Sequence, residues 1–224
     1  MFKDRLDAAL QMVSALQKYR DQHPLVLAIP RGAVPMGVQI AQALNGPFDV
    51  VLVRKLRAPA QEEVAVGAVD ESGATFIAPW AREMGADVTW LKTETARQMQ
   101  TLRHRRQQYT HARPAVAVQG RVVIVVDDEL ATGATMMAAL KAVRRQHPAR
   151  LICAVPVASA EALRRITPLA DEVVCLSVPP DFQGVGQFYR HFPQIDDAEV
   201  IRLLSECAAA VPHRAPVGQS PLTG

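Results

Sequence analysis

The stretch that decides the fold is Val122–Thr135, which has the sequence VVIVVDDELATGAT. Its five consecutive β-branched residues, without polar alternation, predict a strand buried on both faces of a sheet. Asp127 and Asp128 follow at the carboxyl end of this strand, with a third acid directly after them. Gly133 supplies a turn residue that tolerates a positive φ, and a helix is expected to begin near Thr135. The stretch therefore predicts a strand, a turn and a helix N-terminus in direct succession.

Such a turn is suited to bind the phosphate of a phosphorylated sugar. Successive backbone N–H groups and the helix dipole form an anion cradle, and the hydroxyls of Thr132 and Thr135 add donors. Carboxylates beside a phosphate would repel it, so we expect them to face sugar hydroxyls or a metal ion. A helix cap needs only one Asp, so three acids in a row argue against a purely structural turn. The P-loop pattern and the dinucleotide fingerprint are both absent from the sequence, and the second Asp of a receiver domain is not evident.

The rest of the chain alternates apolar strands with helices. Further strands are expected at Leu25–Ile29, Phe48–Val53, Leu151–Val155 and Val173–Val178, and helices at 4–19, Val34–Leu44, Thr135–Gln146, Ala160–Ile166 and Asp197–Ala210. In the first helix, Leu6, Leu10, Val13 and Leu16 lie on one apolar stripe. The pattern predicts an α/β fold with a doubly wound, mostly parallel five-stranded sheet. We expect one domain over residues 1–210 and a disordered tail over 211–224.

Residues 56–113 interrupt the alternation and predict an insertion. Val64–Val69 and Ala74–Ala78 flank an Asp-Glu-Ser-Gly turn and predict a β-hairpin, and residues 88–110 predict a basic helix. From position 81 to 113 there are seven Lys and Arg against three Asp and Glu, a local charge of +4 in a chain of net charge +3. Such a cluster is most often a solvated face, so Arg103, Arg105 and Arg106 are expected to be exposed.

The composition fits an intracellular globular protein. Of the 224 residues, 49% are hydrophobic and 21% charged, which is enough apolar material for a core. No apolar run approaches the roughly 20 residues that a membrane crossing needs, and the first 20 residues carry charges throughout. Three widely spaced cysteines in apolar segments predict buried, reduced thiols. We therefore expect a cytoplasmic protein without a membrane partner.

Three motifs resemble those of type I phosphoribosyltransferases. Residues 122–135 resemble the family's phosphoribosyl pyrophosphate motif, a hydrophobic strand with two acids and a Thr-Gly-x-Thr turn. Pro30–Ala33 resembles its pyrophosphate loop, and Arg54-Lys55 resembles the basic pair before its mobile catalytic loop. The order of these motifs, together with Ala-Val-Gly-Ala-Val at 65–69 and Gly-Val-Gly-Gln-Phe-Tyr at 184–189, is similar to a bacterial subgroup of uncharacterised phosphoribosyltransferases. The resemblance covers about residues 2–210.

The resemblance implies Mg²⁺-dependent transfer of a phosphoribosyl group from phosphoribosyl pyrophosphate to a nitrogenous base or related acceptor, as in nucleotide salvage. The catalytic residues that it implies are Asp127, Asp128, Lys55 and Arg31. The substrate-binding residues that it implies are Gly32, Ala33, Arg54, Glu129, Ala131, Thr132, Gly133, Ala134 and Thr135. It implies no certain protein ligand for Mg²⁺, which Asp127 and Asp128 would contact through water. It further implies a mobile loop at Arg57–Glu63 and a C-terminal hood over residues 179–196.

Several alternatives stay open at this stage. Ala33 stands where the family often has a second Gly, and Glu129 stands where a small or apolar residue is more usual. Phe182, Phe188 and Tyr189 either stack on a base or fill the core. The competing function is a non-catalytic nucleotide sensor or nucleic-acid-binding regulator on the same fold, although nucleic acid is the less expected partner. The acceptor is not identified, and a homodimer is compatible with the sequence.

Overall fold

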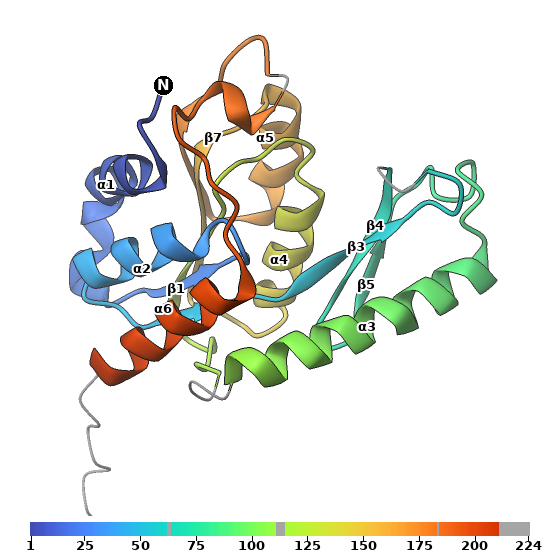
Figure 1. The fold of residues 1–224 in the computed structure, drawn as a ribbon, viewed down its shortest axis with the longest axis horizontal. Helices are drawn as coiled ribbons and strands as arrows, with labels where there is room; N and C mark the ends of the chain where they lie inside the picture. Colours follow the sequence, from blue (N-terminus) through green and yellow to red (C-terminus); the bar gives the residue numbers. More distant parts are fainter. Residues whose placement is uncertain (62–63, 111–114, 183, 211–224) are drawn as a thin grey trace, which may run out of the picture.

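A five-stranded, fully parallel sheet forms the centre of the computed structural model, which describes residues 1–61, 64–110, 115–182 and 184–210 (Figure 1). Its strands, in spatial order, are β2 (Phe48–Val50), β1 (Leu25–Ala28), β6 (Val122–Val126), β7 (Arg150–Val157) and β8 (Glu172–Ser177). β6, the strand of the deciding stretch, lies in the middle, paired with β1 on one side and β7 on the other. The predicted doubly wound α/β sheet is therefore confirmed.

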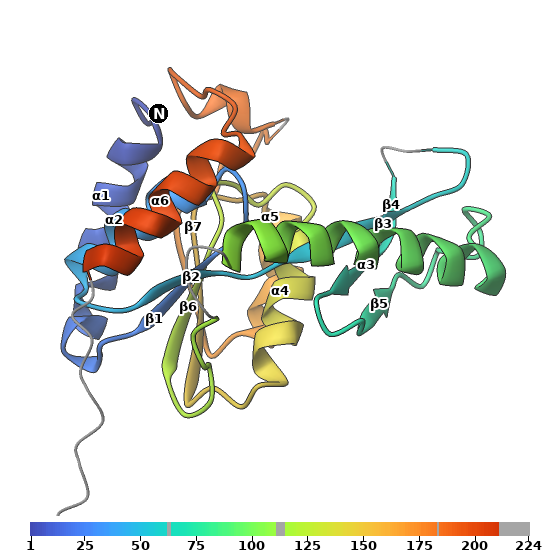
Figure 2. The same ribbon diagram turned by 60° about the horizontal axis from the view of Figure 1, so that its bottom comes forward.

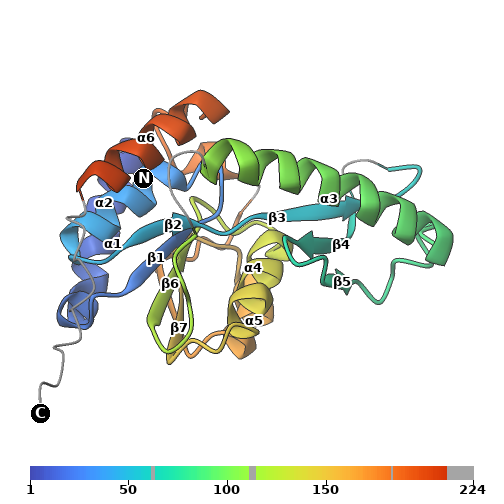
Figure 3. The ribbon, with the colours of Figure 1, turned by 90° about the horizontal axis from the view of Figure 1, so that it is seen from below.

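Helices cover both faces of this sheet, as its unbroken apolar strands require. The helices α1 (Arg5–Leu16), α2 (Val34–Ala43) and α6 (Asp197–Ala210) lie on one side, and α4 (Ala134–Arg144) and α5 (Ala160–Ile166) lie on the other (Figures 1 and 3). Alternate residues of one strand enter the two cores: Ile124 packs toward the first group of helices, and Val123 and Val125 pack toward the second.

The apolar stripe expected on α1 is half right: Leu16 is fully buried and Val13 packs against the core, but the other two residues are not buried. Leu6 and Leu10 are 51% and 56% exposed, whereas Ala8, Ala9 and Met12 are fully buried. The helix packs against α2 through this second face. Alanines allow two helix backbones to approach closely, so here small residues mark the buried face better than leucines do.

The described residues between 53 and 110, which we call the arm, form a separate layer beside the main sheet (Figures 1 and 2). Three antiparallel strands in the order β3 (Val53–Arg57), β4 (Ala65–Asp70) and β5 (Thr75–Ile77) pack against the long helix α3 (Val88–Thr110). The hairpin of β4 and β5 and the basic helix α3 are as predicted, but the strand β3 was not predicted. The expected core strand ends at Val50, so the chain after it belongs to the arm. Arg57 is consequently the last residue of a strand and not part of a loop, and residues 62 and 63 of the expected mobile loop lie outside the described residues.

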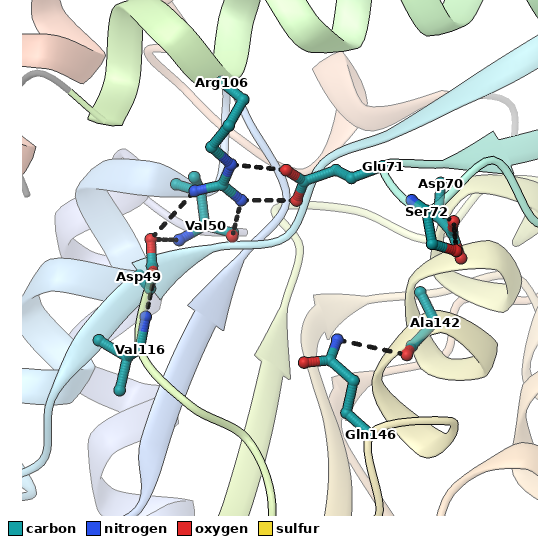
Figure 4. Close-up of polar contacts among 9 residues, drawn as sticks. All are labelled: Asp49, Val50, Asp70, Glu71, Ser72, Arg106, Val116, Ala142 and Gln146. Carbon is teal, nitrogen blue, oxygen red and sulfur yellow. Dashed lines mark hydrogen bonds and ion pairs between the residues drawn. The ribbon is translucent and has the colours of Figure 1, made fainter. Parts of the chain in front are cut away.

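Arg106 joins the arm to the main sheet, contrary to its expected place on an exposed face (Figure 4). Its Nε donates to Glu71 Oε2 at 2.6 Å in the arm, and its Nη2 donates to the Val50 carbonyl at 3.2 Å. Its Nη1 lies 3.7 Å from Asp49 Oδ1, and the other oxygen of that carboxylate accepts the Val116 N–H at 2.8 Å. A second ion pair links the arm to the end of α4.

This second pair joins Arg145 to Asp70, the last residue of β4. Of the other two arginines expected on the exposed face, Arg103 is exposed and Arg105 is half-buried. Two guanidinium–carboxylate contacts, Arg106 with Asp49 and Arg145 with Asp70, thus join the arm to its neighbours, in addition to the packing of α4 against β3 and β4.

None of the helices in the described ranges combines the length and apolar character that a membrane crossing requires. Cys153 and Cys207 are buried thiols, as expected, and Cys175 is only partly buried. The expected tail, 211–224, lies outside the described residues.

Candidate active site

The polar residues that follow β1 and β6 meet at one edge of the sheet. The two strands are neighbours, with Ala28 opposite Val126, so the chain segments that leave them lie side by side. A pocket of about 420 Å³ opens at this edge. It is lined by residues 29–32 after β1, residues 127–129 and Thr135 after β6, Arg5 from α1, and residues 192–195 of the predicted hood.

The turn between β6 and α4 forms a smaller hollow of about 110 Å³, lined by residues 127–136 and Lys55. Gly133 takes a φ of 77°, and α4 begins at Ala134, one residue before the expected start. The turn is anchored from outside: Leu130 N–H donates to the Val157 carbonyl at 3.0 Å, and Ser159 Oγ donates to the Ala131 carbonyl at 2.7 Å. A rigid hollow of this size at a helix N-terminus suits a single phosphate group.

Arg5 was not found by sequence reasoning, yet it fixes one of the two central acids. Its Nε donates to Asp128 Oδ2 at 3.0 Å, its Nη2 lies 3.0 Å from the same oxygen, and its Nη1 donates to the Pro193 carbonyl at 2.7 Å. The guanidinium also stacks 3.6 Å from the centre of the Phe192 ring. The side chains of Arg5 and Asp128 are only 9% and 12% exposed. Asp128 is therefore held by a buried ion pair that also anchors the hood.

The other two acids lie in an electrostatically unfavourable setting. Burial, and then the adjacent carboxylate of Asp128, raise the pKa of Asp127 well above its usual range. Burial and Asp128 also raise the pKa of Glu129, an effect that Lys55 partly offsets. Donor hydroxyls or a cation bound beside these carboxylates would relieve the repulsion.

Gly32 approaches the acid pair so closely that a side chain has no room. A Cβ at this position would lie 2.8 Å from Asp128 Cγ, which is too close for any carbon contact. Ala33, by contrast, is fully buried in the core beneath α2, so its methyl group does not line the pocket. The backbone of the Pro30–Ala33 turn therefore lies directly against the carboxylates.

The basic pair Arg54-Lys55 is divided between two faces of β3, because side chains alternate along a strand. Lys55 lines the phosphate hollow. Arg54 faces α3, where its Nε donates to Gln98 Oε1 at 2.8 Å. The structure thus brings Lys55, but not Arg54, to the site. Arg31 lines the main pocket, with its Nη1 3.8 Å from Asp197 Oδ2.

The three aromatic residues considered for base stacking do not line this pocket. Tyr189 is buried, packs against Phe192, and donates its hydroxyl to the Asp128 carbonyl at 2.9 Å. Phe182 and Phe188 stack on each other, with ring centres 5.3 Å apart. Phe192 is the aromatic side chain that the hood contributes to the pocket.

Within the described parts of the chain, no group of three or more His, Cys, Asp or Glu side chains is arranged to hold a metal ion. The acids at 127–129 nevertheless offer carboxylate oxygens, the ligand type that Mg²⁺ takes. Mg²⁺ is commonly bound through one or two carboxylates together with substrate phosphates and water. The donor set therefore fits a magnesium ion that arrives with a phosphorylated substrate.

Comparison with known proteins agrees with this arrangement. The model of the "Phosphoribosyl transferase domain" family matches residues 5–192. A protein of Mycobacterium tuberculosis, named "Putative phosphoribosyl transferase Rv0571c", is 36% identical over 205 residues, which cover 91% of this chain and 46% of that protein. The chain thus spans about half the length of this relative. The crystal structure of TT1426 from Thermus thermophilus has a TM-score of 0.80 and 45% identity, covering 92% of this chain and 98% of that one. The chain belongs to the phosphoribosyl transferase family.

Proposed function

We propose that the protein transfers the phosphoribosyl group of phosphoribosyl pyrophosphate to a nitrogenous acceptor and releases pyrophosphate, as in nucleotide salvage. One observation carries this proposal. A hollow sized for one phosphate and a pocket lined by a glycine turn with an arginine lie at the ends of β1 and β6, and both are lined by the acids at 127–129. A phosphorylated sugar with a second anionic group needs this combination.

Each part of the opening has a role in holding the sugar. The hollow would take the 5′-phosphate, with backbone N–H groups at the start of α4 and the hydroxyls of Thr132 and Thr135 as donors. Asp127 would accept hydrogen bonds from the ribose hydroxyls, which also relieves its repulsion with Asp128. Arg5 holds Asp128 in place, so the ribose hydroxyls would meet a pair of carboxylates that is already in position.

Cleavage of the bond between C1 and pyrophosphate leaves positive charge on the sugar and negative charge on the leaving group. Asp127 and Glu129 would provide negative potential near the sugar, and Arg31 and the Gly32 N–H would stabilise the leaving pyrophosphate. Lys55 would neutralise the 5′-phosphate in the hollow that it lines. Such groups accelerate the reaction to the extent that they bind the transition state better than the substrate. Mg²⁺ bound with the substrate would add charge neutralisation at the pyrophosphate oxygens, and Asp127 would contact it through water.

The direct test is release of pyrophosphate from phosphoribosyl pyrophosphate with Mg²⁺ and a panel of purine and pyrimidine bases. Calorimetry with nucleoside 5′-monophosphates adds a binding readout. Asp127→Asn should weaken monophosphate binding by about 1–3 kcal/mol, the scale of a hydrogen bond to a charged group. Asp21→Asn, an exposed acid on the 3₁₀ turn after α1, is the matched control and should leave binding unchanged.

The same experiment separates the proposal from a nucleotide sensor. Monophosphate binding that depends on Asp127, without turnover of any base, would favour the non-catalytic role. Binding that Asp127→Asn leaves undiminished would place the ligand elsewhere and contradict the proposal.

A further inference from the structure

A pocket of about 310 Å³ lies between the three-stranded sheet of the arm and α4, and the proposed transfer reaction does not use it. Figure 3 shows α4 beside β4, and the residues that line the pocket come from both sides of this contact. Phe76 of β5 and Trp80, three residues after that strand, line it from the arm, and Met137 lines it from α4. We call it the apolar pocket. Its volume is within the range of pockets that bind small molecules.

The walls of the apolar pocket are suited to a flat ring. Lys141 Nζ lies 3.7 Å from the centre of the Phe76 ring, and the Arg165 guanidinium lies 5.8 Å from the centre of the Trp80 ring. These cation contacts help to hold the two rings in place. Trp80 is 39% exposed, so a bound ring would cover apolar surface that faces water. Aromatic rings and the thioether of Met137 both make favourable contacts with a further ring.

The apolar pocket adjoins the phosphate hollow. Lys55, Thr132 and Ala134 line both. The main pocket shares residues 127–129 and Thr135 with the hollow, but it shares no lining residue with the apolar pocket. The hollow therefore lies between the two pockets. A phosphate bound in it would have the proposed sugar site on one side and the apolar walls on the other.

We propose that the apolar pocket binds an aromatic ring that is esterified to a phosphate group in the hollow. This inference rests on the proposed function, because it takes the hollow as a phosphate site. The ring would pack among Phe76, Trp80 and Met137. Lys55 and the hydroxyl of Thr132, at the boundary of the two spaces, would contact the phosphate. Such an aromatic phosphate ester would compete with phosphoribosyl pyrophosphate for the hollow, so the arm would carry a site of inhibition.

Calorimetry with phenyl phosphate and methyl phosphate tests this assignment at about pH 8, where both phosphates are doubly charged. The two esters differ in the group that would enter the apolar pocket. We expect phenyl phosphate to bind at least about tenfold more tightly, because its ring leaves water for apolar walls. Lys55→Ala should weaken the binding of both esters about tenfold, because it removes a charge-assisted contact with the phosphate that they share.

The fluorescence of Trp80 gives a local readout. The chain has two tryptophans, so a Trp90→Phe background leaves Trp80 as the reporter. Phenyl phosphate should change this fluorescence with a saturable curve, and methyl phosphate should not.

Met137→Ala and Trp80→Ala should each reduce the preference for phenyl phosphate at least threefold, because each removes part of the apolar wall. Neither residue lines the hollow, so binding of methyl phosphate should stay unchanged and serve, with thermal melting, as the measure of intact folding. Met99→Ala is the matched control. Met99 is a partly buried methionine of α3 that does not line the apolar pocket, and its replacement should leave the preference unchanged.

Each outcome separates this inference from the proposed transfer reaction. Equal binding of the two esters, or a preference that Met137→Ala and Trp80→Ala both retain, would overturn the apolar pocket and leave the transfer reaction to its own test of pyrophosphate release. Failure of both esters to bind would overturn the hollow as a phosphate site, and this inference with it. A preference for phenyl phosphate that depends on the two wall residues, without turnover of any base, would support the apolar pocket and count against the transfer reaction.

Discussion

Replacement of Arg5 by methionine should lower the free energy of unfolding more than replacement of any exposed charged residue would. Methionine keeps much of the aliphatic length that packs on Phe192 but leaves the Asp128 carboxylate buried without its cation. Both side chains of this ion pair are about one-tenth exposed, and two nitrogens of the arginine lie 3.0 Å from one oxygen. Removal of one partner of a buried pair typically costs about 3–5 kcal/mol. Because a typical domain unfolds with about 5–15 kcal/mol, the variant should be marginal at 37 °C.

Urea unfolding of four proteins measures this effect: the parent, Arg5→Met, Asp128→Asn and the double variant. The uncharged amide in the double variant removes the orphaned charge, so its free energy of unfolding should exceed that of Arg5→Met by about 2 kcal/mol. Loss of less than about 1 kcal/mol in Arg5→Met would refute the reasoning. So would a double variant no more stable than Arg5→Met, because the cost would then come from lost packing alone.

Three further predictions concern the opening itself. Lys55→Ala should weaken the binding of nucleoside 5′-monophosphates by about 1–3 kcal/mol, because Lys55 lines the hollow that would take the 5′-phosphate; calorimetry checks this, and unchanged binding would contradict the assigned role. Gly32→Ala should lower the free energy of unfolding by about 1–3 kcal/mol, since its methyl group would collide with Asp128; an unchanged urea midpoint would show that the turn can move away. Asp127→Asn should raise the free energy of unfolding of the ligand-free protein at pH 7–8, because burial and Asp128 raise the pKa of Asp127 and so penalise its charged form. This gain should shrink as the pH falls and the parent carboxyl becomes protonated, and melting curves that show the opposite trend would contradict the assignment.

The sequence predicted well those features that depend only on residues close together along the chain. The strand, acids and turn of residues 122–135 are local, and so the positive φ of Gly133 and the start of α4 follow from residue types alone. The strand β3 was missed because Val53–Arg57 is rich in charge and becomes a strand only by pairing with β4. Without that strand, the opposite directions of Arg54 and Lys55 could not be anticipated.

The residues missed at the site depend on contacts between distant segments. Arg5 lies 123 positions before Asp128, and no local pattern marks a helical arginine as the partner of an acid in another element. Arg106 looks like its exposed neighbours in a basic helix, and its partners lie 35 and 56 positions away. Such pairings are set by the packing of whole elements, which periodicity and composition do not encode.

We expect the position of Lys55 relative to the phosphate hollow to depend on salt concentration, because ion pairs of Arg106 and Arg145 join the arm to the rest of the molecule. Lys55 enters the phosphate hollow from the arm, while the rest of the hollow belongs to the main sheet. Arg106 and Arg145 join the arm to β2 and to the end of α4 through ion pairs with Asp49 and Asp70, and the attraction between partly exposed charges weakens as ions screen them. Dissolved ions would therefore act at two places: on the binding of the proposed anionic ligands, and on the ion-paired junction that positions Lys55 beside them.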